Sequence, residues 1–371
     1  MAGLYIHIPF CKSRCIYCGF YSTVGLALRQ RYVDAVCREM VLRPPVSDGL
    51  AGGSSPITTI YLGGGTPSQL TGEQLRQLFL YIYKVYGDSA TEVTIECNPD
   101  DITMPFAETL SQLPINRVSM GAQTFDDRRL RFLHRRHTAS QVHDAVRRLR
   151  AAGITNISVD LMYGFPDETT DDWQQDIDAA LSLDVEHLSA YCLMVEEGTA
   201  LHRMGIEPCD EETERTMYYT LIDRLCAAGY EHYEISNFAR PGRRSCHNQS
   251  YWNDVPYIGL GAAAHSYDLT SRQWNVSDIH QYMAAIEQGT IPCEHELLDE
   301  DTRYNDRITV ALRTCEGLDL KTLSDKHRRY CLHEAQRFID DGLLRLTDDH
   351  LVLTRQGLFV SDMVMSELIY A

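Results

Sequence analysis

Short apolar runs alternate with amphipathic helical stretches over about the first 200 residues, and this alternation predicts a parallel β-sheet. Six runs rich in Val, Ile and Tyr are expected as strands buried on both faces: residues 4–8, 57–62, 92–96, 117–120, 157–161 and 187–192. The segments between them space apolar residues three and four apart, which predicts helices at 29–42, 72–86, 104–113, 140–152 and 170–183. Because βαβ crossovers are right-handed, such a sheet curls into a full or partial (β/α) barrel.

The remainder of the chain departs from this alternation. Residues 201–300 are less regular, and residues 301–371 predict helices followed by a hairpin: 304–314, 320–327 and 333–341, then 343–346 and 351–353. We therefore expect a barrel domain at 1–235, a connecting segment at 236–300, and an α-rich, winged-helix-like domain at 301–371. Residues 44–56 are rich in Pro, Gly and Ser and are expected to form a surface loop.

Composition narrows the functional classes. Lys and Arg total 34 against 52 Asp and Glu, so the formal charge of -18 repels phosphate backbones and argues against nucleic acid as a partner. No window of about 18 apolar residues is free of charge, so no integral membrane segment is expected. The first residues lack the basic region and the cleavage pattern of a signal peptide, which favours the cytoplasm.

Cys11, Cys15 and Cys18 form a C-x3-C-x2-C run directly after the first predicted strand, at the carboxyl end of the barrel, where such folds build their sites. Three thiolates can hold three corners of a [4Fe-4S] cluster and leave one iron open for an outside ligand. Zinc is the main alternative, but a structural zinc site has four ligands, and no second CxxC or His pair follows. His7 is a candidate fourth ligand, and three incidental buried cysteines are the remaining interpretation.

Further candidate site residues lie at or after the carboxyl ends of the successive predicted strands, and they are expected to share one pocket. They comprise the glycine-rich segment 63–67 and four charged or amide side chains, Glu96, Gln123, Arg135 and Asp160. Glycines let backbone amides approach a ligand closely, although they also suit a tight strand-to-helix turn. Each side chain alone could be an ordinary loop residue. Together the carboxylates suit a ribose or an amino group and the guanidinium suits a carboxylate, as a zwitterionic nucleoside such as S-adenosylmethionine requires.

At this point the sequence resembles the radical S-adenosylmethionine (radical SAM) superfamily, and within it the coproporphyrinogen III oxidase-like branch. Four segments carry this resemblance, which spans residues 4–371: Tyr-Ile-His-Ile-Pro-Phe-Cys at 5–11, Gly-Gly-Gly-Thr-Pro at 63–67, Asn-Arg-Val-Ser-Met-Gly-Ala-Gln-Thr-Phe at 116–125, and Asp-Leu-Met-Tyr-Gly-Phe-Pro at 160–166. It implies an α/β fold with a partial (β/α)6 TIM-type radical SAM barrel. In that superfamily a reduced cluster donates one electron to the sulfonium of S-adenosylmethionine, so an electron donor is implied as a partner.

The resemblance also assigns residues. It implies that Cys11, Cys15 and Cys18 ligate the cluster, and that nine residues contact S-adenosylmethionine: Tyr5, Tyr17, Gly64, Gly65, Thr66, Glu96, Gln123, Arg135 and Asp160. The cleaved nucleoside yields a 5′-deoxyadenosyl radical in that superfamily, and the protein contributes placement, exclusion of water and tuning of the cluster. No residue of this chain is assigned as catalytic.

Two members of the branch fit, and they differ in function. One is the oxygen-independent coproporphyrinogen III dehydrogenase of porphyrin biosynthesis; the other is a heme chaperone that passes heme to respiratory hemoproteins. Three features favour the chaperone: Gly19-Phe20-Tyr21 follows Cys18 where the dehydrogenase has Gly-Cys, only four residues precede Tyr5, and residues 247–252 read H-N-x-x-Y-W. Chaperone-like chains more often have Asp where this chain has Gly19.

His247 of this last motif is the candidate heme ligand. An imidazole can bind heme iron axially, and aromatic side chains can flank the macrocycle. The structural alternative is a buried, hydrogen-bonded histidine, and Cys246, Tyr251 and His265 are rival ligands. The apolar stretch at 358–368 suits packing on the barrel and peripheral contact with a membrane equally well.

Overall fold

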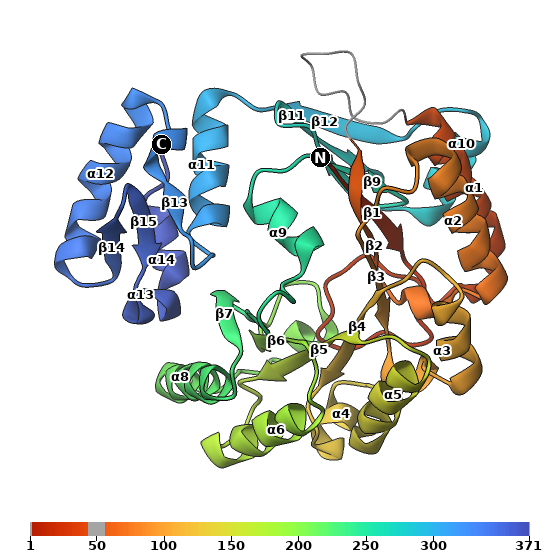
Figure 1. Ribbon diagram of the computed structural model, residues 1–371, viewed down its shortest axis with the longest axis horizontal. Coiled ribbons are helices and arrows are strands. Elements are labelled where there is room, and N and C mark those ends of the chain that lie inside the picture. Colours follow the sequence, from red (N-terminus) through yellow and green to blue (C-terminus); the bar gives the residue numbers. More distant parts are fainter. Residues whose placement is uncertain (1, 44–55, 371) are drawn as a thin grey trace.

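The computed structural model describes residues 2–43 and 56–370, so the predicted surface loop lies, apart from Pro56, outside the described residues. All six predicted strands are present: β1 (Ala2–Ile8), β2 (Ile57–Gly64), β3 (Glu92–Cys97), β4 (Arg117–Gln123), β5 (Asn156–Tyr163) and β6 (His187–Cys192). They lie side by side in chain order, and each neighbouring pair is parallel. The curved sheet in Figure 1 is therefore an open, partial α/β barrel.

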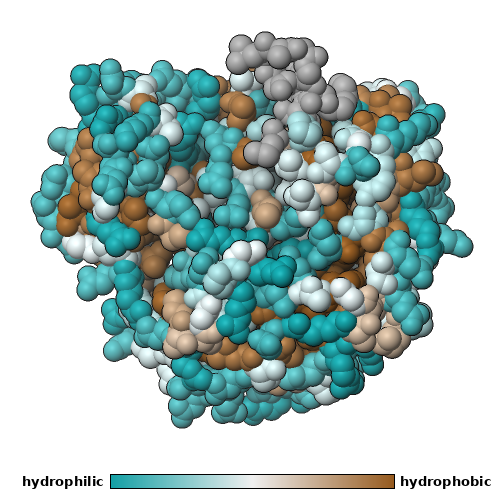
Figure 2. All heavy atoms as spheres, viewed as in Figure 1, coloured by the Kyte–Doolittle hydropathy of each residue, from teal (hydrophilic) through white to brown (hydrophobic). Residues whose placement is uncertain are grey.

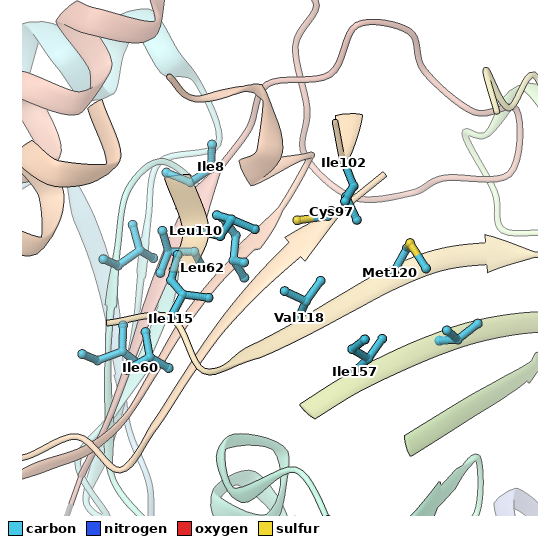
Figure 3. Packing of buried hydrophobic residues seen from close by; sticks show 14 of the residues in the cluster. Ile8, Ile60, Leu62, Cys97, Ile102, Leu110, Ile115, Val118, Met120 and Ile157 are labelled. Carbon is cyan, nitrogen blue, oxygen red and sulfur yellow. The ribbon is translucent and has the colours of Figure 1, made fainter. Parts of the chain in front are cut away.

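Helices cover the outer face of this sheet (Figure 1): α1 (Arg29–Leu42), α2 (Gly72–Tyr86), α3 (Met104–Ser111), α4 (Asp127–Phe132), α5 (Ala139–Ala151) and α6 (Thr170–Ser182). Side chains that precede the helices define their first residues, as Thr71 does by accepting a hydrogen bond from Gln74 N at the start of α2. Ile60 and Leu62 of β2, Val118 of β4 and Leu110 of α3 belong to one buried cluster, part of which Figure 3 shows.

Strand alternation gives the sheet two different faces. In β3, Val93 and Ile95 join the apolar cluster beneath the helices, so Glu92, Thr94 and Glu96 point to the concave face. The same alternation turns polar side chains of β4 and β5 inward. A TIM-type barrel is usually filled by Val, Ile and Leu. A polar inner wall of this kind indicates that the concavity receives a polar ligand.

The less regular region adds short strands to both edges of the sheet. At the β1 edge lie β9 (Tyr257–Leu260), β10 (His265–Tyr267), β11 (Ser271–Asn275) and β12 (Cys293–Leu297), and at the β6 edge lie β8 (Asn237–Ala239) and β7 (Glu231–Glu234). The region also contains the helices α7 (Ala200–Arg203), α8 (Glu211–Ala227) and α10 (Ile279–Glu287). A further helix, α9 (Cys246–Trp252), lies inside the curve of the sheet and contacts β1 and β2 (Figure 1).

The C-terminal part has its own buried cluster, formed by α11 (Glu300–Ala311), α12 (Asp325–Asp340), α13 (Arg355–Phe359), α14 (Ser361–Glu367) and the small sheet β13 (Leu318–Asp319), β14 (Leu344–Thr347) and β15 (His350–Leu353). The predicted hairpin is confirmed. The predicted helix at 320–327 is wrong: a 3₁₀ turn ends at Thr322, and Ser324 caps one continuous helix α12. The division of the chain at residues 235 and 300 stays a prediction.

The last helical segment is also divided. The helix is interrupted at Val360, between α13 and α14. The apolar residues Val364, Met365 and Leu368 of this segment belong to the C-terminal cluster. This packing accounts for the apolar stretch at 358–368 without a membrane. In the ranges 2–43 and 56–370, no helix is both long and apolar enough to cross a bilayer.

Candidate functional site

The loop after β1 holds the three clustered cysteines, all free and half-buried. Segments distant in sequence approach them: Thr66 Oγ1 lies 3.4 Å from Cys11 Sγ, and Arg135 Nη1 lies 3.6 Å from Cys15 Sγ. Burial raises the pKa of the Cys11 thiol and of the Cys18 thiol. The cysteine loop, the end of β2 and the segment after α4 therefore meet at the carboxyl ends of the strands, as the sequence predicts.

The donor set fits an iron–sulfur cluster better than a single metal ion. In the part of the chain that the structure describes, no three His, Cys, Asp or Glu side chains converge closely enough to hold one ion. A cluster instead places each thiolate on a different iron, which spreads the ligands apart. His7, the candidate fourth ligand, is buried with Nδ1 3.1 Å from Tyr5 Oη and Nε2 2.9 Å from the Tyr21 carbonyl. Both ring nitrogens are thus engaged by the protein, which leaves three soft thiolates as the donor set.

Gly64 and Gly65 bring the ends of β1 and β2 together. A Cβ on Gly64 would lie 2.5 Å from His7 Cε1, and one on Gly65 would lie 2.7 Å from the Pro9 carbonyl carbon. Gly64 also has a φ of 108°, a conformation that side chains rarely adopt. Its N–H donates to Glu96 Oε2 at 3.1 Å. Because the Gly65 N–H likewise donates to the Ile8 carbonyl at 2.9 Å, the two glycines are required by the close packing of β1 against β2.

Two carboxyl groups face the concavity of the sheet. Glu96 accepts from Tyr61 Oη at 2.8 Å, and Asp160 lies 3.5 Å from the Ser119 hydroxyl. Burial raises the pKa of Glu96 to about 7 and that of Asp160 to about 6. A hydroxyl or ammonium donor of a ligand would replace the hydration that these carboxylates lose, so both suit the ribose and amino groups predicted for this pocket.

Arg135 supplies the positive charge of the pocket. Its Nη2 donates to Asn98 Oδ1 at 2.8 Å and to the Gly121 carbonyl at 2.5 Å, while Nε is buried without a protein partner in the described residues. A guanidinium with an unused N–H can bind the carboxylate of a zwitterion. Asn98, which also donates to Thr66 Oγ1 at 3.5 Å, was not among the predicted residues. Its position directly after β3 is the signal that could have found it.

The remaining predicted residues lie around this core of the site. Gln123 has a φ of 68° at a bulge in β4, and Tyr17 is close enough to Cys15 and Arg135 for their charges to affect it. Tyr5 lies deeper, where its ring stacks on that of Tyr61 at 6.2 Å. Cys11, Cys15, Thr66, Glu96 and Arg135 are thus gathered at one rim, with Tyr5 beneath them. Their roles toward ligands stay predictions.

The raised pKa of Glu96 predicts a pH dependence of stability. A carboxyl whose pKa rises on folding stabilises the fold when protonated, so this contribution is complete below its ordinary value of 4.5 and is lost as the pH passes about 7. We expect the free energy of unfolding, measured in urea, to fall from pH 5 to pH 8, by about 2–3 kcal/mol through Glu96. Glu96→Gln should flatten that part of the curve, and parallel curves for the variant and the parent would contradict this origin.

His247 occupies a buried position at the start of α9. Its Nδ1 lies 2.8 Å from Thr59 Oγ1 and its Nε2 lies 2.9 Å from Tyr251 Oη, while its ring stacks on Tyr61 at 5.0 Å. Glu92 accepts from the backbone N–H groups of Cys246 and His247 at the positive end of the helix. Burial lowers the pKa of His247 to about 3. Heme ligation by this ring would break one of its two hydrogen bonds, and this role stays a prediction.

Two family models match the chain. The radical SAM superfamily model matches residues 5–180, and the HemN C-terminal domain model matches residues 298–360. The chain is 34% identical to the heme chaperone HemW of Bacillus subtilis over 96% of both chains. It is 35% identical to the heme chaperone HemW of Mycobacterium tuberculosis, over 99% of this chain and 94% of that protein.

Among solved structures, the coproporphyrinogen III oxidase HemN of Escherichia coli, described as a radical SAM enzyme, is similar with a TM-score of 0.85. The match covers 99% of this chain and 90% of that one at 21% sequence identity. At this identity the likeness concerns the fold alone. It confirms the predicted fold class, a partial radical SAM barrel followed by a C-terminal helical domain.

Proposed function

Because this chain belongs to the heme chaperone HemW family of radical SAM proteins, we propose that it binds heme and delivers it to respiratory hemoproteins. The observation that carries the proposal is the extent of the likeness, which covers 96% and 99% of this chain. It includes the barrel, α9 with the H-N-x-x-Y-W motif, and the C-terminal helices. We place this activity in the cytoplasm.

The carboxyl-end site is proposed to hold a [4Fe-4S] cluster and S-adenosylmethionine. When bound, the cluster supplies single electrons and S-adenosylmethionine supplies a group that can accept one. Cys11, Cys15 and Cys18 hold three irons through thiolates. Arg135 binds the carboxylate of the nucleoside through its unused Nε–H, and Glu96 accepts from a hydroxyl. The half-buried thiols, the buried Nε and the raised pKa of Glu96 support these roles.

Tyr5, Tyr17, Gly64, Gly65, Thr66, Gln123 and Asp160 complete the proposed nucleoside set. Gly64 and Gly65 approach their neighbours more closely than a side chain permits, and their N–H groups already donate to Glu96 Oε2 and to the Ile8 carbonyl, so they shape the segment that carries Thr66. Asp160 faces the same concavity as Glu96, where it suits an amino or hydroxyl group. An external electron donor is proposed to reduce the cluster.

The enzymatic alternative is the conversion of coproporphyrinogen III to protoporphyrinogen IX. The fold is shared with an enzyme named for coproporphyrinogen III, so the fold leaves both functions open. Phe20 stands where the dehydrogenase pattern has an additional cysteine, and its side chain is 70% exposed beside the cluster loop. An exposed phenyl ring cannot ligate metal or exchange thiols, and this difference favours the chaperone.

Delivery requires contact with an acceptor hemoprotein. Hydrophilic residues cover most of the face seen in Figure 2, and the formal charge is -18. Such a surface makes long-range attraction to acidic partners or anionic lipids unfavourable, so we propose that recognition of the acceptor is local. Peripheral contact with a membrane is compatible with this arrangement when the acceptor is membrane-bound.

Heme transfer tests the proposed function. The heme-loaded protein is mixed with membranes that contain an apo-form of a respiratory hemoprotein, and recovery of that hemoprotein's activity is followed. We expect faster recovery than with the same concentration of free heme, because a chaperone contacts the acceptor before release. A non-acceptor heme binder such as heme-loaded serum albumin is the control. Recovery no faster than with that control would argue against delivery.

A further inference from the structure

A second cleft lies away from the cluster site. Its volume is about 900 Å³, and its walls are the end of α9, the strands β9–β11 and, from the C-terminal part, α11 and the segment that includes β13. This volume is within the range of cofactor sites, about 300–1,000 Å³. The aromatic side chains of Tyr251, Trp252, Tyr257 and Tyr267 line the cleft, and the C-terminal part contributes the apolar residues Val310 and Leu318. The cleft therefore offers the aromatic and apolar surface that a flat macrocycle needs.

His265 is the one histidine that lines this cleft in the described residues. It lies on β10, opposite Trp274 of β11, and the two rings stack with centroids 6.2 Å apart. Its side chain is exposed, and neither ring nitrogen has a hydrogen-bond partner in the described part of the chain. Burial and then Arg272 lower the pKa of His265, which favours the neutral imidazole that binds metals. His265 is thus held in place and free to ligate.

Two arginines of the cleft suit the carboxylates of a ligand. Arg272 pairs with Asp306 through Nη2, which leaves its other N–H groups for a further acceptor. Arg307 pairs with Asp254 at 2.6 Å. Asp306 and Asp254 neutralise the charges of Arg272 and Arg307 when the cleft holds no ligand. A dicarboxylate would therefore bind mainly through the remaining N–H donors of Arg272. The cleft thus combines one iron ligand, aromatic walls and a guanidinium at its side.

The H-N-x-x-Y-W motif gains a structural explanation from this cleft. Tyr251 and Trp252 line it, whereas His247 lies behind them and is 1% exposed. The 2.9 Å hydrogen bond between His247 Nε2 and Tyr251 Oη, together with the one between Nδ1 and Thr59 Oγ1, fixes the position of the Tyr251 ring. The histidine of the motif therefore supports a wall of the cleft.

We propose that this cleft is the heme site, that His265 ligates the iron, and that His247 is a positioning residue that holds Tyr251 against the macrocycle. The inference rests on the proposed heme-binding function and names the site at which it occurs. Ligation forms one bond between an imidazole nitrogen and iron and displaces only solvent from the metal, so no redox partner is needed.

Heme titration of the full-length, anaerobically reconstituted protein tests the assignment. His265→Ala should weaken the heme affinity about tenfold or more and change the heme spectrum, and added imidazole should restore the spectrum. His247→Ala should weaken the affinity but keep the spectrum of a histidine-ligated heme. His280→Ala, which removes an exposed histidine of α10, is the matched control and should change neither.

Other outcomes distinguish a wrong choice of iron ligand from a failure of the proposed heme-binding function. Loss of the histidine-ligated spectrum in His247→Ala, with an unchanged His265→Ala, would overturn the proposal in favour of His247. A parent protein that binds no heme would instead contradict the proposed function.

Arg272→Met provides an independent test that leaves the iron ligand in place: it should weaken binding of heme but not of heme dimethyl ester, which lacks the free carboxylates. Equal effects on both probes would remove Arg272 from the site. Circular dichroism and urea unfolding of each variant show that the fold is retained.

Discussion

Cys15→Ser is expected to abolish the iron–sulfur absorption and most of the iron content of the reconstituted protein while the barrel stays folded. Serine offers an alcohol where the cluster needs a thiolate, and loss of one of three protein ligands leaves two irons without protein coordination. The fold should tolerate the change because Cys15 lies in the loop after β1, outside the buried apolar clusters. Iron and sulfide analysis and the visible spectrum, both taken under anaerobic conditions, measure the loss.

Cys226→Ser is the matched control for that change. Cys226 is exposed on α8, outside the cluster loop, so its replacement should leave the iron content and the spectrum of the parent. Full iron content in Cys15→Ser would contradict the three-thiolate site. Equal loss in both variants would show that cysteine chemistry elsewhere controls reconstitution.

Gly64→Ala is expected to destabilise the protein by roughly 2–6 kcal/mol and to weaken S-adenosylmethionine binding. The φ of 108° costs an L-residue about 1–3 kcal/mol, and the new methyl group overlaps the His7 ring, which adds about 1–3 kcal/mol. His7 cannot move aside easily because Tyr5 and the Tyr21 carbonyl hold its two nitrogens. Urea unfolding measures the first effect, and nucleoside titration of the folded variant measures the second.

Gly87→Ala distinguishes the cost of a positive φ from the cost of the overlap with the His7 ring. Gly87 also has a positive φ, 81°, at the end of α2, but a Cβ there would meet nothing within 4 Å. Its replacement should cost only the backbone term, about 1–3 kcal/mol, and should leave nucleoside binding intact. If both variants lose the same stability, the close approach of β1 and β2 does not require Gly64, and its place in the nucleoside site loses this support.

The parallel core of the fold could be predicted from the sequence because its signals are local. Helices α1 and α2 span the residues expected from apolar spacing, and β6 begins and ends where its apolar run does. Long periodic segments carry enough apolar positions to define a face. The predicted division of α12 is wrong because the buried residues His327, Cys331, Ala335 and Phe338 follow one another at helical spacing, and Ser324, a usual N-cap, marks where the continuous helix begins.

The edges of the sheet could not be predicted in the same way. Strands β7 to β12 have three to five residues, and their pairing joins segments far apart in the chain, as β9 with β1. Such pairing is decided by tertiary contacts that leave no local period. Helix α4, with six residues, is likewise too short to show one.

The part of the candidate site that lies at the ends of the parallel strands could be predicted from the sequence. Residues at the ends of consecutive parallel strands must share one rim, so Glu96 and the cysteine loop could be placed together. The sequence could not decide between His247 and His265 as candidate ligands of the heme iron. A motif names His247, but only the three-dimensional structure places its ring behind Tyr251 and leaves His265 exposed in a cleft.

The most direct test of the central claim is heme titration of the anaerobically reconstituted protein, with an assay for protoporphyrinogen IX run in parallel on coproporphyrinogen III. Both experiments include S-adenosylmethionine and a reductant. The account predicts stoichiometric heme uptake without porphyrinogen turnover. Turnover of coproporphyrinogen III by a protein that retains no heme would contradict it and would identify a biosynthetic enzyme.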